Sequence, residues 1–171
     1  MDEVAGPRRK CAEICLDLLH SETVRCFEER PYGPNASASL ESTGMHVGRQ
    51  LVERLTKDKP RLTDTLEVIK YLCKDFWIYV FGKQIDNLRT NHRGVYVLQD
   101  NNFRWLHRFA AVPQGDPSLA AETHKLALSH LHLPCGIIRG ALCHLGVACT
   151  VEASEAKLLP ACAFTIRVVT A

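Results

Sequence analysis

The residues best suited to chemistry gather in one apolar stretch, "LPCGIIRGALCHLG", at residues 133–146. Its two cysteines and one histidine raise the possibility of a thiol nucleophile with its base. Cys143 and His144 are adjacent, however, and neighbouring side chains of a helix point about 100° apart. They therefore cannot act on each other, and nothing selects another histidine as the base. We expect structural cysteines and no enzymatic activity.

Phosphate and metal chemistry fit this stretch no better. The segment "CGIIRG" lacks both the spacing and the lysine of a phosphate-binding loop. Cys11 and Cys15 are four apart, but the chain has no C-x-x-C pair. On a helix, His130 and His132 would point away from each other. We expect no cofactor and no metal, so a zinc or thiol enzyme is the least supported function.

Length and composition indicate an ordinary cytosolic protein. With 171 residues, we expect a flexible segment at 1–10 and a single domain at 11–171. The net charge of +2 gives no electrostatic reason for nucleic-acid binding. No secretion signal is evident, so the eight cysteines are expected to be reduced thiols. Arg139 and the glycines make residues 133–151 a poor membrane span.

Hydrophobic periodicity predicts helices first, then a hairpin, a helix and a second hairpin. Helices are expected at residues 9–29, 40–55 and 66–80, with "RPYGPNASAS" as a loop and Asp64 as an N-cap. Strands are expected on both sides of residues 91–94, and two more after residue 146. Between them, one helix is expected to begin at Ser118 and another at Pro134. This order predicts an α+β fold in which a four-stranded antiparallel sheet packs against helices on one side.

Close packing is the interpretation that best explains the opening stretch. Gly136 and Gly140 lie four residues apart on one face of the expected helix, and Gly44 and Gly48 do the same on the second helix. Small residues at this spacing let another backbone approach closely. Gly146 is expected to end the helix and permit the turn into a strand.

At these residues the chain resembles a known family. "CGIIRGAL", followed by "LGV" and a strand, resembles a shared segment of the small subunits of TRAPP, the transport protein particle. "GMHVGRQLVERL" is similar to the other shared segment. "LCKDFWIYVFGKQIDNLRTNHRGVYVLQDNNF" and "LPACAFTIRV" are similar to the subunit-six branch. The resemblance covers residues 40–169, and residues 16–29 more loosely.

The resemblance implies the family fold and a non-catalytic role as a core and adaptor subunit. It implies a heterodimer with the acylated small subunit of TRAPP, contacts with other TRAPP subunits, and an indirect link to a Rab-type GTPase on which the complex catalyses nucleotide exchange. It also implies a cytoplasmic location peripheral to Golgi and endoplasmic reticulum membranes. The alternative function is a small apolar-ligand-binding sensor, because related domains of this topology enclose an apolar tunnel.

Two segments depart from the family pattern. The acylated relative carries its lipid on a cysteine between the second and third helices, whereas residues 56–62 of this chain contain none. Acylation at that site is therefore not carried over. Residues 110–133 are longer and richer in histidine than expected, so no role is transferred to them.

The first helix has an apolar arc too broad for one core, which favours a second contact with a partner. The second helix adds a flat, glycine-bearing face. We therefore expect these two helices to form the partner interface. The candidate anchors are large apolar residues, of the kind that carry most binding energy at a contact centre: Leu16, Leu19, Phe27, Leu51 and Leu55.

Overall fold

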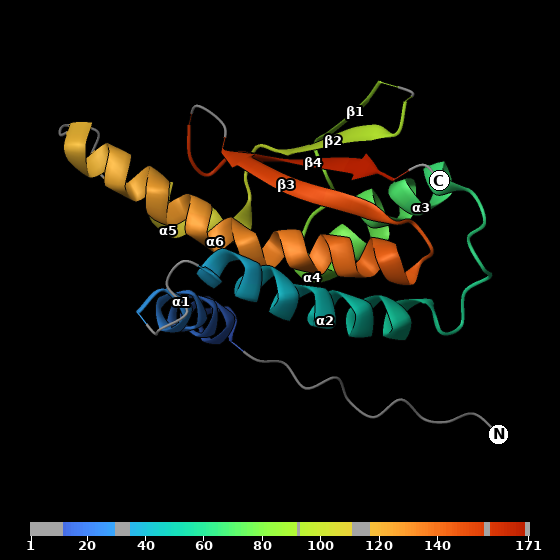
Figure 1. Ribbon diagram of the computed structural model, residues 1–171, viewed down its shortest axis with the longest axis horizontal. Coiled ribbons are helices and arrows are strands. Elements are labelled where there is room, and N and C mark those ends of the chain that lie inside the picture. Colours follow the sequence, from blue (N-terminus) through green and yellow to red (C-terminus); the bar gives the residue numbers. More distant parts are fainter. Residues whose placement is uncertain (1–11, 30–34, 92, 111–116, 156–157, 170–171) are drawn as a thin grey trace.

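A four-stranded sheet with helices packed against one face forms the molecule, as the computed structural model in Figure 1 shows. The structure describes residues 12–29, 35–91, 93–110, 117–155 and 158–169. The expected flexible segment 1–10 lies outside them. The elements follow in this order: α1 (Glu13–Glu29), α2 (Ala36–Thr56), α3 (Thr65–Tyr71), the π-helical turn η2 (Leu72–Phe76), α4 (Trp77–Phe81), β1 (Asn87–Thr90), β2 (Val95–Asp100), the 3₁₀ turn η3 (Arg104–Leu106), α5 (His107–Ala110), α6 (Pro117–His144), β3 (Cys149–Glu155) and β4 (Cys162–Val168).

The sheet has the strand order β1-β2-β4-β3, and every neighbouring pair is antiparallel. Leu98 of β2 pairs with Phe164 of β4, and Ile166 of β4 pairs with Val151 of β3. All four are buried, because alternate side chains of a strand point to the same face. The expected α+β fold with its antiparallel sheet is confirmed.

The β1–β2 hairpin turns where the sequence predicts it. Asn91 Oδ1 accepts hydrogen bonds from the backbone N–H groups of Arg93 and Val95, at 2.9 and 3.1 Å. Gly94 has a φ of 82°, a conformation that favours glycine. The turn therefore follows from local residue types alone.

Helices α2 and α6 cross almost backbone to backbone. A Cβ atom on Gly44, Gly48, Gly136 or Gly140 would lie 2.0–2.2 Å from a carbonyl oxygen of the facing helix. The approach is reciprocal, since each helix contributes two of the four glycines. No side chain larger than hydrogen fits at any of these positions without a shift of the backbone.

Helix α6 is one continuous helix of 28 residues, so the expectation of a separate helix starting at Pro134 is wrong. A proline inside a helix lacks the N–H that would bond the carbonyl four residues earlier, which here belongs to His130. The helix stays unbroken because residues with high helix propensity precede Pro134 and because the residues after Pro134 pack against α2. The expected end is confirmed: Gly146 has a φ of 88°, and its N–H donates to the Cys143 carbonyl.

Other local expectations need correction. Helix α2 begins at Ala36, so residues 36–39 are helical although their composition favours a loop. Burial of Ala36 accounts for this, because tertiary packing overrides a weak local preference. Asp64 precedes α3 but makes no side-chain capping hydrogen bond. The helix expected at 66–80 contains the π turn η2, and residues 9–11 of the first expected helix lie outside the described part of the chain.

Aromatic side chains fill the space between the helices and the sheet. The Trp77 ring lies 4.5 Å from that of Phe81 and 5.5 Å from that of Phe164, centroid to centroid. Trp77 Nε1–H donates to the buried carboxylate of Asp100 at 3.0 Å, and Lys83 Nζ donates to the same carboxylate at 2.9 Å. This network ties the end of β2 to α4 and to the turn that follows α4.

Residues 118–144 of α6 are long and apolar enough to cross a membrane by length and composition. The most apolar window of this helix is 61% buried inside the fold, against α2 and β3. That burial is what a central core helix shows, and Figure 1 places α6 between α2 and the sheet.

Candidate partner-binding site

Helix α1 turns most of its apolar residues outward. Its only buried residues are His20 and Val24, which form the stripe that faces the body of the protein. Four large apolar residues in the first half of α1 are exposed, with exposed fractions between 43% and 64%: Ile14, Leu16, Leu18 and Leu19. We call these four residues the α1 apolar face.

The α1 apolar face ends halfway along the helix. Beyond it, the outward side of α1 carries Arg25, which forms ion pairs with both Glu22 and Glu29. All three side chains are more than half exposed, so these pairs stabilise a solvated helix end only weakly. Within α1, the exposed large apolar residues therefore lie in the N-terminal half.

The structure separates the five sequence-based anchors into two groups. Leu16 and Leu19 belong to the α1 apolar face. Phe27 is half-buried near the end of α1, and Leu51 and Leu55 are half-buried on α2, where they pack against the hydrophobic core. The five residues therefore do not form one continuous exposed patch.

The anchors chosen from the sequence leave out three apolar residues that the structure shows to be exposed. Ile14 and Leu18 lie on the apolar arc recognised from the sequence, but the periodicity alone does not say which side of that arc faces the core. Val47, which is 39% exposed, is the large apolar residue that α2 presents to solvent. His20 is the residue that could have shown which side of α1 faces the core, because a polar residue such as histidine can itself be the buried anchor of a helix.

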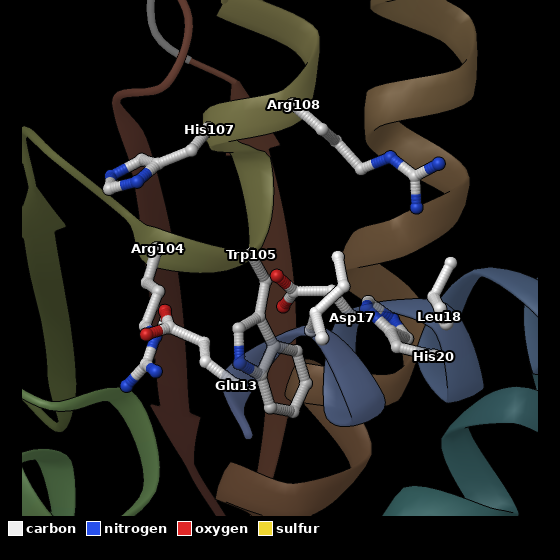
Figure 2. Close-up of a pocket in the computed structure, with 9 residues that line it drawn as sticks. Glu13, Asp17, Leu18, His20, Arg104, Trp105, His107 and Arg108 are labelled. Carbon is white, nitrogen blue, oxygen red and sulfur yellow. Dashed lines mark hydrogen bonds and ion pairs between the residues drawn. The ribbon is translucent and has the colours of Figure 1, made fainter.

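A cleft lies beside the α1 apolar face, between α1 and the segment formed by η3 and α5 (Figure 2). Its volume is about 230 Å³. Five residues of α1 and four of η3–α5 line it: Glu13, Ile14, Asp17, Leu18, His20, Arg104, Trp105, His107 and Arg108. In the sequence, Arg104, His107 and Arg108 form only a short basic group, without a motif that indicates a site.

Charged groups of both signs stand on opposite walls of this cleft. Glu13 on α1 forms an ion pair with Arg104 on η3, which closes one side. The Asp17 carboxylate and the Arg108 guanidinium make no ion pair with any described residue. Among the described residues, the cleft therefore holds one carboxylate and one guanidinium without an ion-pair partner.

Buried rings form the floor. The His20 ring lies 4.7 Å from the Trp105 ring and 5.1 Å from the His130 ring. Trp105 Nε1, His20 Nε2 and His130 Nε2 are buried and have no hydrogen-bond partner among the described residues.

Burial lowers the pKa of His20 from 6.5 to about 4. The nearby charge of His130 adds to this, and a hydrogen bond to the His130 backbone opposes it. Burial also lowers the pKa of His130. Both rings are therefore neutral at pH 7.

The thiols of the core are poorly suited to nucleophilic chemistry. Burial raises the pKa of Cys73, Cys135 and Cys149 to about 12, and raises that of Cys162 as well. A thiol rather than a thiolate is a weak nucleophile and metal ligand. Within the described ranges, no group of three or more histidine, cysteine or acidic residues could hold a metal ion.

Comparison with known proteins identifies the family. A sequence profile described as "Transport protein particle (TRAPP) component" matches residues 16–169. The chain is 48% identical to trafficking protein particle complex subunit 6B of Mus musculus, over 91% of this chain and 96% of the relative. It is 40% identical to subunit 6A of Homo sapiens, over 90% and 94%.

Among solved structures, the chain is similar to trafficking protein particle complex subunit 3 from Naegleria fowleri, which was crystallised covalently bound to palmitic acid. The TM-score is 0.68 at 16% identity, with 93% of this chain and 98% of that chain covered, so this similarity concerns the fold. The sequence resemblance stated above is confirmed. The profile match and the identities together show that this chain belongs to the TRAPP component family, as a relative of subunits 6A and 6B.

Proposed function

We propose that the chain is a non-catalytic core and adaptor subunit of a TRAPP vesicle-tethering complex. In this role it supports the nucleotide exchange that the assembled complex performs on a Rab-type GTPase. It works at the cytoplasmic side of Golgi and endoplasmic reticulum membranes, in traffic between them. Family membership supports its place among TRAPP subunits, and the raised pKa values of Cys135 and Cys149 make these two thiols poor nucleophiles.

The observation that carries the adaptor role is the α1 apolar face. Four large aliphatic side chains are exposed within two turns of one helix. Large apolar residues exposed this close together are candidates for an interaction site. We assign it to the acylated small subunit of TRAPP as heterodimer partner, with Leu16 and Leu19 as anchors. The half-buried Phe27, Leu51 and Leu55 are proposed as further contacts outside this face.

In this heterodimer the lipid belongs to the partner. The connection between α2 and α3 contains no cysteine in this chain. The subunit 3 relative is, by contrast, covalently bound to palmitic acid. We therefore propose that this chain reaches the membrane only as part of the complex.

Co-expression with the acylated small subunit, followed by size-exclusion chromatography, tests the interface. Leu19→Glu should give a folded monomer that no longer co-elutes with the partner. Leu158→Glu is a matched control, because Leu158 in the β3–β4 connection is 65% exposed and Leu19 is 64% exposed. If Leu19→Glu and Leu158→Glu both co-elute like the unmodified chain, the α1 apolar face is not the interface.

The absence of catalysis has its own test. Cys143→Ser in a folded chain should leave partner binding and the exchange activity of the assembled complex unchanged. Metal analysis of the purified protein should find no stoichiometric zinc. Loss of exchange activity with intact assembly would instead assign chemistry to this thiol.

The alternative of an apolar-ligand sensor has less support. Four aromatic side chains, Trp77, Phe81, Phe103 and Phe164, are buried between the helices and the sheet, where a ligand tunnel would run. Mass spectrometry of the purified chain under native conditions should therefore find no bound fatty acid. Stoichiometric fatty acid would favour the sensor.

A further inference from the structure

We propose that the cleft between α1 and η3–α5 binds an extended peptide segment of the partner subunit, which inserts one apolar side chain beside Leu18. This inference deepens the proposed function and rests on it, because it names a second contact site for the same partner. Figure 2 shows the cleft with the side chains of α1 on one wall and those of η3–α5 on the other.

Size favours a single side chain over a free small molecule. The cleft has a volume of about 230 Å³. Pockets for drug-sized ligands are larger, at about 300–1,000 Å³. One large aliphatic or aromatic side chain would fill much of the space, and Ile14 and Leu18 would supply its apolar wall.

The charges favour peptide backbone beside that side chain. Asp17 and Arg108 make no ion pair with described residues, and they stand on opposite walls. A strongly acidic segment would be repelled by Asp17, and a strongly basic one by Arg108. A peptide backbone has one donor and one acceptor per residue, so it can donate an N–H to Asp17 and accept from Arg108.

The floor of the cleft supports the same ligand. Trp105 Nε1–H is buried and lacks an acceptor among the described residues. The Trp105 side chain itself is 7% exposed. Because an indole N–H can only donate and this one does not reach the cleft surface, a backbone carbonyl would provide the missing acceptor only after the side chains around Trp105 shift on binding.

Continuity with the α1 apolar face identifies the partner. Ile14 and Leu18 line the cleft and also belong to that face, with exposed fractions of 58% and 59%. A protein that covers the apolar face therefore meets the mouth of the cleft at these two residues. The acylated small subunit proposed above is accordingly the protein whose segment we place there.

The test combines affinity with a local readout, using purified full-length chain and the acylated small subunit. Arg108→Glu should weaken binding about tenfold, because it places a second carboxylate opposite Asp17. Arg89→Glu, an exposed arginine on β1, is the matched control and should bind like the unmodified chain. Backbone hydrogen exchange of residues 103–110 should slow when the partner binds.

Leu19→Glu, assayed in parallel, separates the two proposals. If Leu19→Glu abolishes binding while Arg108→Glu matches Arg89→Glu and residues 103–110 gain no protection, the cleft inference is overturned and the proposed interface stands. If Leu19→Glu binds normally, the α1 apolar face is wrong as interface. Protection of residues 103–110 would in that case still support the cleft, and its absence would overturn it.

Discussion

Two helix contacts in this molecule are built in opposite ways. Helices α2 and α6 approach through four glycines, with each facing carbonyl oxygen too close for any Cβ atom. Helix α1 instead docks through side chains, chiefly His20 and Val24, and leaves its larger aliphatic residues in solvent. A contact between two backbones is possible in only one arrangement of the helices. A contact made by side chains can be replaced by a different set of side-chain contacts. The first contact belongs to the folding core, and the second suits an element that meets a partner.

The largest effect is expected from a substitution that disrupts the contact between α2 and α6. In Gly48→Val the new Cβ would lie 2.0 Å from the Ile137 carbonyl oxygen, so the helices must separate. We expect a loss of unfolding free energy of about 3 kcal/mol, the upper end for overpacking. Chemical denaturation measures it, with Ser42→Val on the exposed side of α2 as the control. Equal midpoints for the two variants would contradict a backbone-tight crossing.

As the pH falls, α1 should lose its docked position at a higher pH than the one at which the contact between α2 and α6 weakens. The pKa of His20 is about 4 when α1 is docked and 6.5 when it is free, so between these values the free state binds more protons. Docking is therefore fully stable above about pH 6.5 and is lost as the pH falls toward 4, with a cost of about 2 kcal/mol at pH 5. Hydrogen exchange of α1 and α6 at pH 7 and pH 5, corrected for intrinsic rates, measures this. His20→Gln should remove most of the difference, and an equal response of both helices would disprove it.

A smaller effect distinguishes local from global stability. Val24→Ala removes contacts that hold α1 on the protein and leaves the other helix contacts intact. It should lower the free energy of α1 docking by about 1 kcal/mol. We expect amide exchange within α1 to accelerate about fivefold, while the denaturation midpoint of the domain changes little. Tryptophan fluorescence and exchange mass spectrometry, read together, decide the point. A parallel shift of the whole domain would mean that α1 is part of the cooperative core.

The smallest effect concerns the ion pair across the crossing. His132 Nδ1 lies 3.3 Å from Glu41 Oε1, and both side chains are more than a third exposed. Exposed pairs contribute little, so Glu41→Gln should change the unfolding free energy by less than about 0.5 kcal/mol. Thermal unfolding of this variant and the unmodified chain would reveal a larger contribution. In that case the side-chain contact, and not only the backbone packing, would stabilise the crossing.

The sequence predicts what depends on local spacing. The glycine pairs on α2 and α6, the turn at residues 91–94 and the helix end at Gly146 all follow from residue type and period. Pro134 shows the limit, because its local preference to start a helix loses to the packing of α6 on both sides of it. Asp64 is a similar case, since a capping sequence does not guarantee the capping bond.

The candidate site was harder to predict for a different reason. Helix α1 is apolar on most of its circumference, and the residue that anchors it is the polar His20, so hydrophobicity points to the wrong side. The cleft joins residues 13–20 with residues 104–108, which no local pattern connects. Trp105 and Arg108 acquire their relation to Asp17 only through the tertiary fold.

The glycine crossing also limits how related chains can vary in length. One residue inserted between Gly44 and Gly48, or between Gly136 and Gly140, would rotate the rest of that helix by about 100°. The second glycine of the pair would leave the contact, and a side chain would meet a carbonyl oxygen in its place. Insertions and deletions among family members should therefore avoid these two five-residue windows and collect in the connections outside them.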